Sequence, residues 1–118
     1  MFALEGVRVL ALENGISAPL CTRLLGDFGA EVVKVERPNV GDVNRQWDSA
    51  VNGYSSSNVW VDRNKQSLEL DLKADDGKEI FFELAAMADV VVQNFSPGVV
   101  ERLGVDYESV RAMNEDIV

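Results

Sequence analysis

Four short apolar runs recur along this chain, at intervals long enough to hold helices between them. Three of them, Val7 to Leu12, Glu31 to Val35 and Asp89 to Gln93, are continuous and rich in valine, as in strands that are covered on both faces of a parallel sheet. The fourth, Ser67 to Leu72, alternates leucine with polar residues, which is typical of a strand with one less buried face. The pattern therefore predicts four strands.

The segments between and after these runs show helical spacing of apolar residues and the usual signals of helix ends. Serine or aspartate stands at the expected caps, proline in two of the first turns, and glycine after the last residue of two helices. The expected helices run from Ser17 or Ala18 to Phe28, from Asp75 or Asp76 to Met87, from Pro97 to Leu103 with Ser96 as its cap, and from Asp106 to about Met113. Their expected inward faces are Leu20, Leu24, Leu25 and Phe28 in the first helix, and Ile80, Phe81, Leu84 and Ala85 in the second.

The order of these elements predicts an α/β fold. It is a Rossmann-like parallel sheet with flanking helices, built from βαβ units with right-handed crossovers. We expect the sheet to be incomplete, because Asp116 to Val118 resembles the opening of a further strand. Residues 38–60 are rich in Asn, Gly, Ser and Asp, and their apolar residues follow neither the helical nor the strand period. They therefore predict a long loop of the kind that is usually functional or mobile.

Size and composition place the chain among globular proteins. Its 118 residues and 13.0 kDa predict one domain that buries roughly two thirds of its unfolded surface. The 47% hydrophobic and 26% charged residues are ordinary for a soluble protein. No apolar run approaches the roughly 20 residues that span a bilayer, and the first residues show neither a basic n-region nor a cleavage site. We therefore expect a cytoplasmic protein without a membrane partner.

Two absences in the sequence exclude several kinds of chemistry. The chain has no histidine and one cysteine, Cys21, so it offers neither a Cys/His zinc site nor an imidazole acid-base pair, and we expect no metal. On its helix, Cys21 is expected to be a small buried hydrophobic residue. The net charge of −9 argues against a nucleic-acid partner, because phosphate neutralisation needs clustered Lys and Arg.

Polar residues gather just past the expected carboxyl ends of the strands, where an open α/β sheet binds its ligands. The loop after the first strand lacks a GxGxxG fingerprint and no Walker motif occurs, so neither an ordinary NAD domain nor a P-loop is expected. Three cations and two helix starts at this edge favour an anionic, polyphosphate ligand. The residues concerned are Ser17, Arg37, Lys73, Asn94, Phe95, Ser96 and Arg102.

Three of these residues also have a purely structural interpretation. Arg37 could form a solvated surface pair with its neighbour Glu36, which would contribute well under about 1 kcal/mol. Lys73 could be an ordinary surface lysine, and Asn94 could serve a turn. Taken singly, none of these residues defines a ligand site.

Longer segments of the chain are similar to one protein family. These segments are LEGVRVL (4–10), APLCTRLLGDFGAEVVKVERP (18–38), GD…R.W (41–47), RNKQSLELDLK (63–73) and ADVVVQNFSPGVVERLGVDYESVRAMN (88–114). In this order they resemble the amino-terminal part of the class III CoA-transferases, which include formyl-CoA transferase, carnitine CoA-transferase and α-methylacyl-CoA racemase. The resemblance runs from about Leu4 to the last residue.

The resemblance implies a set of CoA contacts that coincides with the crevice residues above. In the family, basic groups hold the CoA phosphates, which suits Arg37 and Arg102 as donors. Ile16 departs from formyl-CoA transferase, which has a glutamine there, and so argues against oxalate or formate as acyl groups. The implied contacts are Ile16, Ser17, Arg37, Leu70, Asp71, Leu72, Lys73, Asn94, Phe95, Ser96 and Arg102.

By the same resemblance, the whole protein would transfer CoA between carboxylic acids, with acyl-CoA and a carboxylic acid as partners in an interlocked homodimer. The family's nucleophile is an aspartate that forms mixed anhydride and thioester intermediates, and it lies beyond the position of Val118. Residues 1–118 are thus expected to be the amino-terminal part of the large domain, without a second domain, without a catalytic residue and inactive alone. The alternatives are part of a 2-methylacyl-CoA racemase and a non-catalytic CoA- or nucleotide-binding module.

Overall fold

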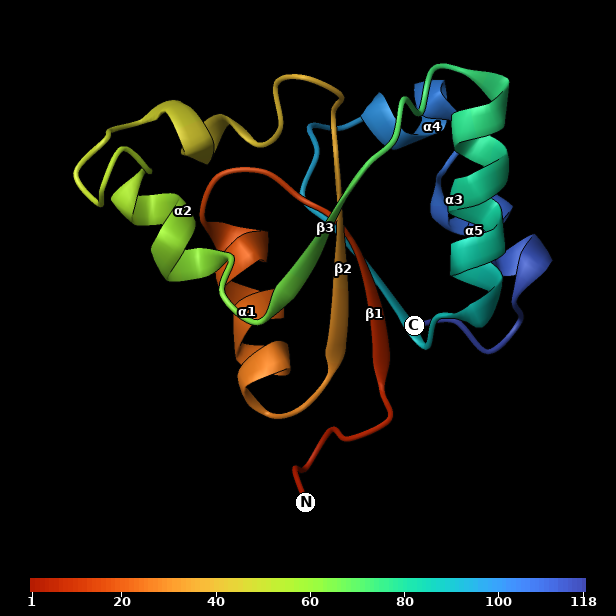
Figure 1. Cartoon of the computed structure of the whole chain (residues 1–118). Coiled ribbons are helices and arrows are strands. Elements are labelled where there is room, and N and C mark those ends of the chain that lie inside the picture. Colours follow the sequence, from red (N-terminus) through yellow and green to blue (C-terminus); the bar gives the residue numbers. More distant parts are fainter.

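The computed structural model describes residues 1–118 and contains a four-stranded parallel sheet (Figure 1). Its strands are β1 (Arg8–Leu12), β2 (Glu31–Glu36), β3 (Lys65–Glu69) and β4 (Val90–Gln93), in the spatial order β3-β2-β1-β4. All three pairings are parallel, with Val9 of β1 aligned to Val32 of β2 and Val90 of β4. The α/β, Rossmann-like fold predicted from the sequence is therefore confirmed.

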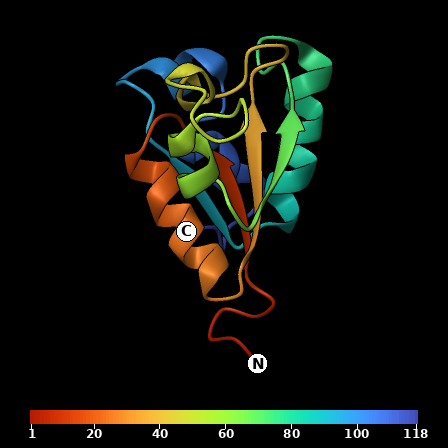
Figure 2. The same cartoon turned by 60° about the vertical axis from the view of Figure 1, so that its left-hand side comes forward.

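Helices cover both faces of this sheet (Figures 1 and 2). On one face lie α1 (Ser17–Asp27) and α2 (Ser56–Val61), and on the other lie α3 (Asp75–Met87), α4 (Val99–Leu103) and α5 (Tyr107–Met113). Because side chains alternate across a strand, Leu10 and Leu12 of β1 join the core under α3, which contains Phe81 and Ala85. The residues that alternate with them, Val9 and Ala11, belong to the smaller core under α1. No helix combines the length and apolar content needed to cross a bilayer.

The structure corrects three predicted boundaries. The third strand is Lys65–Glu69 rather than Ser67 to Leu72. The amide of Leu70 still donates to the carbonyl of Glu36 at 3.0 Å, but Leu70 and Leu72 lie beyond the strand, with their side chains in the core. The fourth helix begins at Val99, since Gly98 adopts a left-handed conformation as its N-cap and Ser96 makes no capping bond with its side chain. The predicted loop 38–60 contains a short 3-10 helix, Val43–Gln46, and most of α2.

Some burial predictions are also wrong. Ile80, Leu24 and Phe28 were expected to face inward, but their exposed fractions are 43%, 44% and 58%. Helical spacing identifies an apolar side of a helix without showing how far the neighbouring layer extends to cover it. Cys21 is likewise exposed and is not the buried residue that was expected.

The last residue adds to the sheet beside β4. The amide of Val118 donates to the carbonyl of Asp89 at 3.2 Å, and the amide of Val91 donates to the carbonyl of Val118 at 2.9 Å. These two bonds have the alternation of a parallel ladder. The predicted opening of a further strand at residues 116–118 is therefore seen at Val118, on the free edge of β4.

Candidate functional site

The predicted contact residues lie around the carboxyl edge of the sheet, which is uppermost in Figure 1. Arg37 directly follows β2, Leu70–Lys73 follows β3, and Asn94–Ser96 follows β4. Ile16 and Ser17 lie where the loop after β1 enters α1. Because all four strands are parallel, their carboxyl ends meet along one edge, and sequence segments up to 80 residues apart are brought to it.

Cations without carboxylate partners are concentrated near this edge. Six of the chain's eleven Lys and Arg residues form salt bridges: Arg8, Arg23, Lys34, Arg45, Arg63 and Lys65. Of the other five, Arg37 and Lys73 follow strand ends, Arg102 lies on α4, Lys78 lies in the first turn of α3, and Arg111 packs against Tyr107. In a chain with 20 acidic residues, cations left unpaired at this edge of the sheet are available to an anionic ligand.

The solvated pair between Glu36 and Arg37 is not formed. Instead, Arg45 donates two hydrogen bonds to Glu36, from Nε to Oε2 at 2.7 Å and from Nη2 to Oε1 at 2.6 Å. The Glu36 carboxylate also accepts from the amide of Asp42 and the hydroxyl of Ser67. Both oxygens of the Glu36 carboxylate thus accept hydrogen bonds from residues other than Arg37. Arg37 itself is exposed and forms no ion pair.

The Glu36–Arg45 pair changes how the protein responds to acid. Burial raises the pKa of Glu36, but the hydrogen bonds from Arg45 and from the Asp42 amide outweigh burial and bring this pKa to about 2, from an ordinary 4.5. A carboxylate whose folded pKa is lowered stabilises the fold above its ordinary value and loses that contribution as the pH falls through the folded value. Glu36 therefore contributes fully above about pH 4.5 and hardly at all near pH 2.

We expect Glu36→Gln to be less stable than the wild type by about 2 kcal/mol at pH 7, allowing for the partial exposure of Arg45. This difference in the free energy of unfolding should shrink as the pH falls from 4.5 toward 2, because the protonated wild-type side chain then resembles glutamine. Urea unfolding of both proteins across this pH range measures it. A difference that stays constant with pH would contradict the assignment.

Asn94 holds the loop between β1 and α1. Its Nδ2 donates to the carbonyl of Asn14 at 2.8 Å and to Ser17 Oγ at 3.2 Å, while its Oδ1 accepts from the amide of Asn14 at 2.9 Å. The structure therefore brings two of the predicted contact residues, Asn94 and Ser17, into direct contact. A simple turn-forming role would not connect two strand ends in this way.

The turn after β3 is fixed by a close approach of helix α3. A Cβ on Gly77 would lie 2.1 Å from the carbonyl oxygen of Asp71, so only glycine allows α3 to pack against this turn. The Asp71 carboxylate accepts from the amide of Lys73 at 2.9 Å. Leu70 and Leu72 point into the core, which leaves Asp71 and Lys73 exposed at the carboxyl edge.

A buried ionic cluster beneath this edge was not predicted. Lys34 Nζ lies 2.6 Å from Asp42 Oδ2 and 2.7 Å from Asp62 Oδ1, with only 1% of its side chain exposed. Lys65 Nζ contacts Glu13 at 2.6 Å and the same Asp62 oxygen at 3.0 Å. The one signal in the sequence was the lysine in the middle of the valine-rich run EVVKV, because a buried lysine needs acidic partners.

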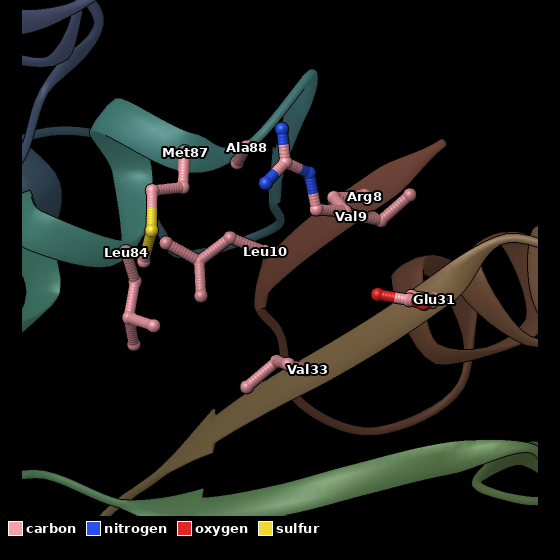
Figure 3. Close-up of a pocket in the computed structure, with 8 residues that line it drawn as sticks. All are labelled: Arg8, Val9, Leu10, Glu31, Val33, Leu84, Met87 and Ala88. Carbon is pink, nitrogen blue, oxygen red and sulfur yellow. The ribbon is translucent and has the colours of Figure 1, made fainter. Parts of the chain in front are cut away.

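A separate hollow lies at the opposite, amino edge of the sheet (Figure 3). Its volume is about 110 Å³ and six of its eight lining residues are hydrophobic. Figure 3 shows Leu84 and Met87 of α3 lying opposite Leu10 of β1 and Val33 of β2. Ligand pockets usually enclose about 300 to 1,000 Å³ with several polar groups, so this hollow does not suit a polyphosphate ligand.

The fold and the connectivity of its strands define an α/β protein with a Rossmann-like parallel sheet. Its sequence matches the model of CoA-transferase family III over residues 4–118, so the chain belongs to this family. The formyl-CoA:oxalate CoA-transferase of Bradyrhizobium sp. (strain ORS 278) is 45% identical over 117 residues, which cover 98% of this chain and 28% of the relative. The succinyl-CoA:glutarate CoA-transferase of Mus musculus is 43% identical over 119 residues, which cover 100% of this chain and 27% of the relative.

Solved structures agree with this assignment. Rv3272 from Mycobacterium tuberculosis superimposes with a TM-score of 0.92 at 34% identity, over 99% of this chain and 33% of that protein. A CAIB/BAIF family protein from Brucella suis gives a TM-score of 0.86 at 36% identity, over 96% of this chain and 31% of that protein. A putative betaketoacyl-ACP reductase, with a TM-score of 0.54 at 18% identity, shares the fold alone. The chain thus spans about a third or less of the proteins that it matches.

Proposed function

We propose that residues 1–118 form the CoA-binding amino-terminal part of an enzyme that transfers CoA between carboxylic acids. The observation that carries this proposal is the group of unpaired cations at the carboxyl edge of the sheet. Three of them, Arg37, Lys73 and Arg102, occupy the positions that the family resemblance implies for CoA contacts. Membership of CoA-transferase family III supplies the reaction class.

The residues present suit the parts of a CoA molecule. Arg37 and Arg102 would donate to phosphate oxygens, because guanidinium groups match phosphate geometry, and Lys73 would add a point charge. The loop residues Ile16 and Ser17, held by Asn94, would line the ligand from the β1 side. Asp71, Phe95 and Ser96, which follow β3 and β4, are further proposed contacts. Leu70 and Leu72, whose side chains lie in the core, would contribute backbone groups only.

The thioester of a bound acyl-CoA offers an activated carbonyl carbon, which a carboxylate can attack with release of the CoA thiolate. We propose no nucleophile among residues 1–118, because the family resemblance places that aspartate beyond Val118. The role of this part of the protein is to bind and orient the CoA moiety, which lowers the entropic cost of the reaction.

The relatives named for oxalate and for glutarate differ by only two percentage points of identity to this chain. Ile16 in place of glutamine argues against oxalate or formate, and this inference stays a prediction. The interlocked homodimer, the cytoplasmic location and the assignment of residues 1–118 to the large domain also stay predictions.

The experiment that tests the proposed reaction is hydroxylamine trapping. The gene product that carries residues 1–118 is incubated with acyl-CoA and then with hydroxylamine, and the modified residue is mapped by mass spectrometry. We expect CoA binding together with an adduct on a carboxylate outside residues 1–118. An adduct on an Asp or Glu within residues 1–118 would contradict the placement of the chemistry, and CoA binding with no adduct would favour a non-catalytic binding module.

A further inference from the structure

We infer that Asp42 and Asn44 are positioning residues that set the geometry of the CoA-binding loop between β1 and α1. The inference rests on the proposed function, because it assigns a role in CoA binding to residues outside the proposed contact set. Both side chains are fully or almost fully buried, at 1% and 0% exposure for the two residues. Neither is among the residues expected to touch CoA.

The two side chains hold both polar groups of one residue, Gly15. Its amide donates to Asp42 Oδ1 at 2.9 Å, and its carbonyl accepts from Asn44 Nδ2 at 3.0 Å. Gly15 has a φ of +76°, a left-handed conformation that other residues rarely adopt. The position next along the chain is Ile16, the first of the proposed CoA contacts.

These bonds belong to a closed ring that runs through the buried ionic cluster. Lys34 Nζ donates to Asp42 Oδ2 and to Asp62 Oδ1, at 2.6 and 2.7 Å. The other oxygen of Asp62 accepts from Asn44 Nδ2 at 3.2 Å, which returns the ring to Gly15. The loop is therefore tied to a lysine in the middle of β2, and its position does not depend on flexible surface contacts.

From its other side, the same loop is held by Asn94, which bonds both the amide and the carbonyl of Asn14. The amide and carbonyl groups of two consecutive loop residues are thus all satisfied by side chains from distant elements. A loop that is already ordered costs less entropy when a ligand binds to it. Loosening one support should therefore weaken CoA binding even though the support does not touch CoA.

The test compares Asn44→Ala with Asn58→Ala in the gene product that carries these residues. Both asparagines are buried in the same cluster and both donate to Asp62 Oδ2, and Asn58 also donates to Asn44 Oδ1 at 3.2 Å, but only Asn44 bonds Gly15. CoA affinity is measured by calorimetry at a temperature well below the unfolding midpoint of each variant. We expect Asn44→Ala to bind CoA about five- to tenfold more weakly, the scale of one lost hydrogen bond, and Asn58→Ala to bind within about twofold of the wild type.

The KM for acyl-CoA should rise in Asn44→Ala while kcat changes less, which a general loss of stability would not produce. If Asn44→Ala does not fold, Asn44→Ser, which keeps a hydroxyl donor, is used in its place with the same expectation of weaker binding. A CoA affinity of Asn44→Ala within about twofold of the wild type would overturn the positioning role and leave the proposed function intact. A wild-type protein that does not bind CoA would overturn the proposed function itself, and the inference with it.

Discussion

Replacing Lys34 with methionine is expected to destabilise the protein by about 3 to 5 kcal/mol, the usual cost of removing one partner from a buried ion pair. Burial lowers the pKa of Lys34, but its hydrogen bonds to Asp42 and Asp62 outweigh burial and raise this pKa above its ordinary value. The lysine is therefore charged at neutral pH. Its loss would leave Asp42 buried without a lysine partner, and Glu13 and Asp62 with Lys65 as their remaining lysine.

This loss is comparable to the whole stability of an ordinary domain, about 5 to 15 kcal/mol, so much of the variant should be unfolded at moderate temperature. Thermal and urea unfolding followed by circular dichroism measure the change. The matched control is Lys78→Met, because Lys78 forms no ion pair, and we expect it to remain within about 0.5 kcal/mol of the wild type. If both variants were equally stable, the buried cluster would not contribute to stability.

Replacing Arg37 with alanine is expected to weaken acyl-CoA binding by about 1.5 to 3 kcal/mol, the range for a hydrogen bond to a charged group. This corresponds to a dissociation constant at least about tenfold higher. The physical reason is that Arg37 ends a buried strand at the ligand edge and has no carboxylate partner of its own. Calorimetry with acyl-CoA at moderate salt measures the change in the gene product that carries these residues.

Arg63→Ala is the matched control for Arg37→Ala. Arg63 is also an exposed arginine, but it is paired with Asp27 at 2.8 Å and lies just before the amino end of β3. We expect its removal to leave CoA affinity within about twofold of the wild type, because it is far along the strand from the carboxyl edge. Equal losses for the two variants would mean a general effect of net charge, and no loss for either would remove Arg37 from the site.

The local pattern of the chain was enough to predict the order of strands and helices. Valine-rich runs such as Val90–Gln93 became strands, and the glycines after α1 and α4 stand at the helix ends. The pattern also located the candidate site, because the carboxyl edge of a parallel sheet follows from strand order alone. Arg37 and Asn94 are predicted as site residues in this way, from their positions after strands.

Boundaries and burial were less accessible to sequence reasoning. Lys65 and Gln66 lie outside the predicted strand Ser67 to Leu72, yet they belong to β3, and the side chain of Lys65 is buried. Conversely, Leu24 and Ile80 read as core residues and are exposed. Polarity along the chain predicts burial only on average, because the covering layer is made by residues elsewhere in the sequence.

By itself, then, the sequence determined the α/β fold, the edge of the sheet that carries the candidate site, and family membership through its long matching segments. The tertiary structure alone decided which charged and polar groups are paired. Lys65 meets Glu13 across 52 positions of the chain, and Asn94 meets Asn14 across 80. A buried charge is stable only beside partners that folding brings to it, and no spacing within the sequence specifies such partners. For the same reason, only the structure shows that Glu36 forms its ion pair with Arg45, while Arg37 forms none.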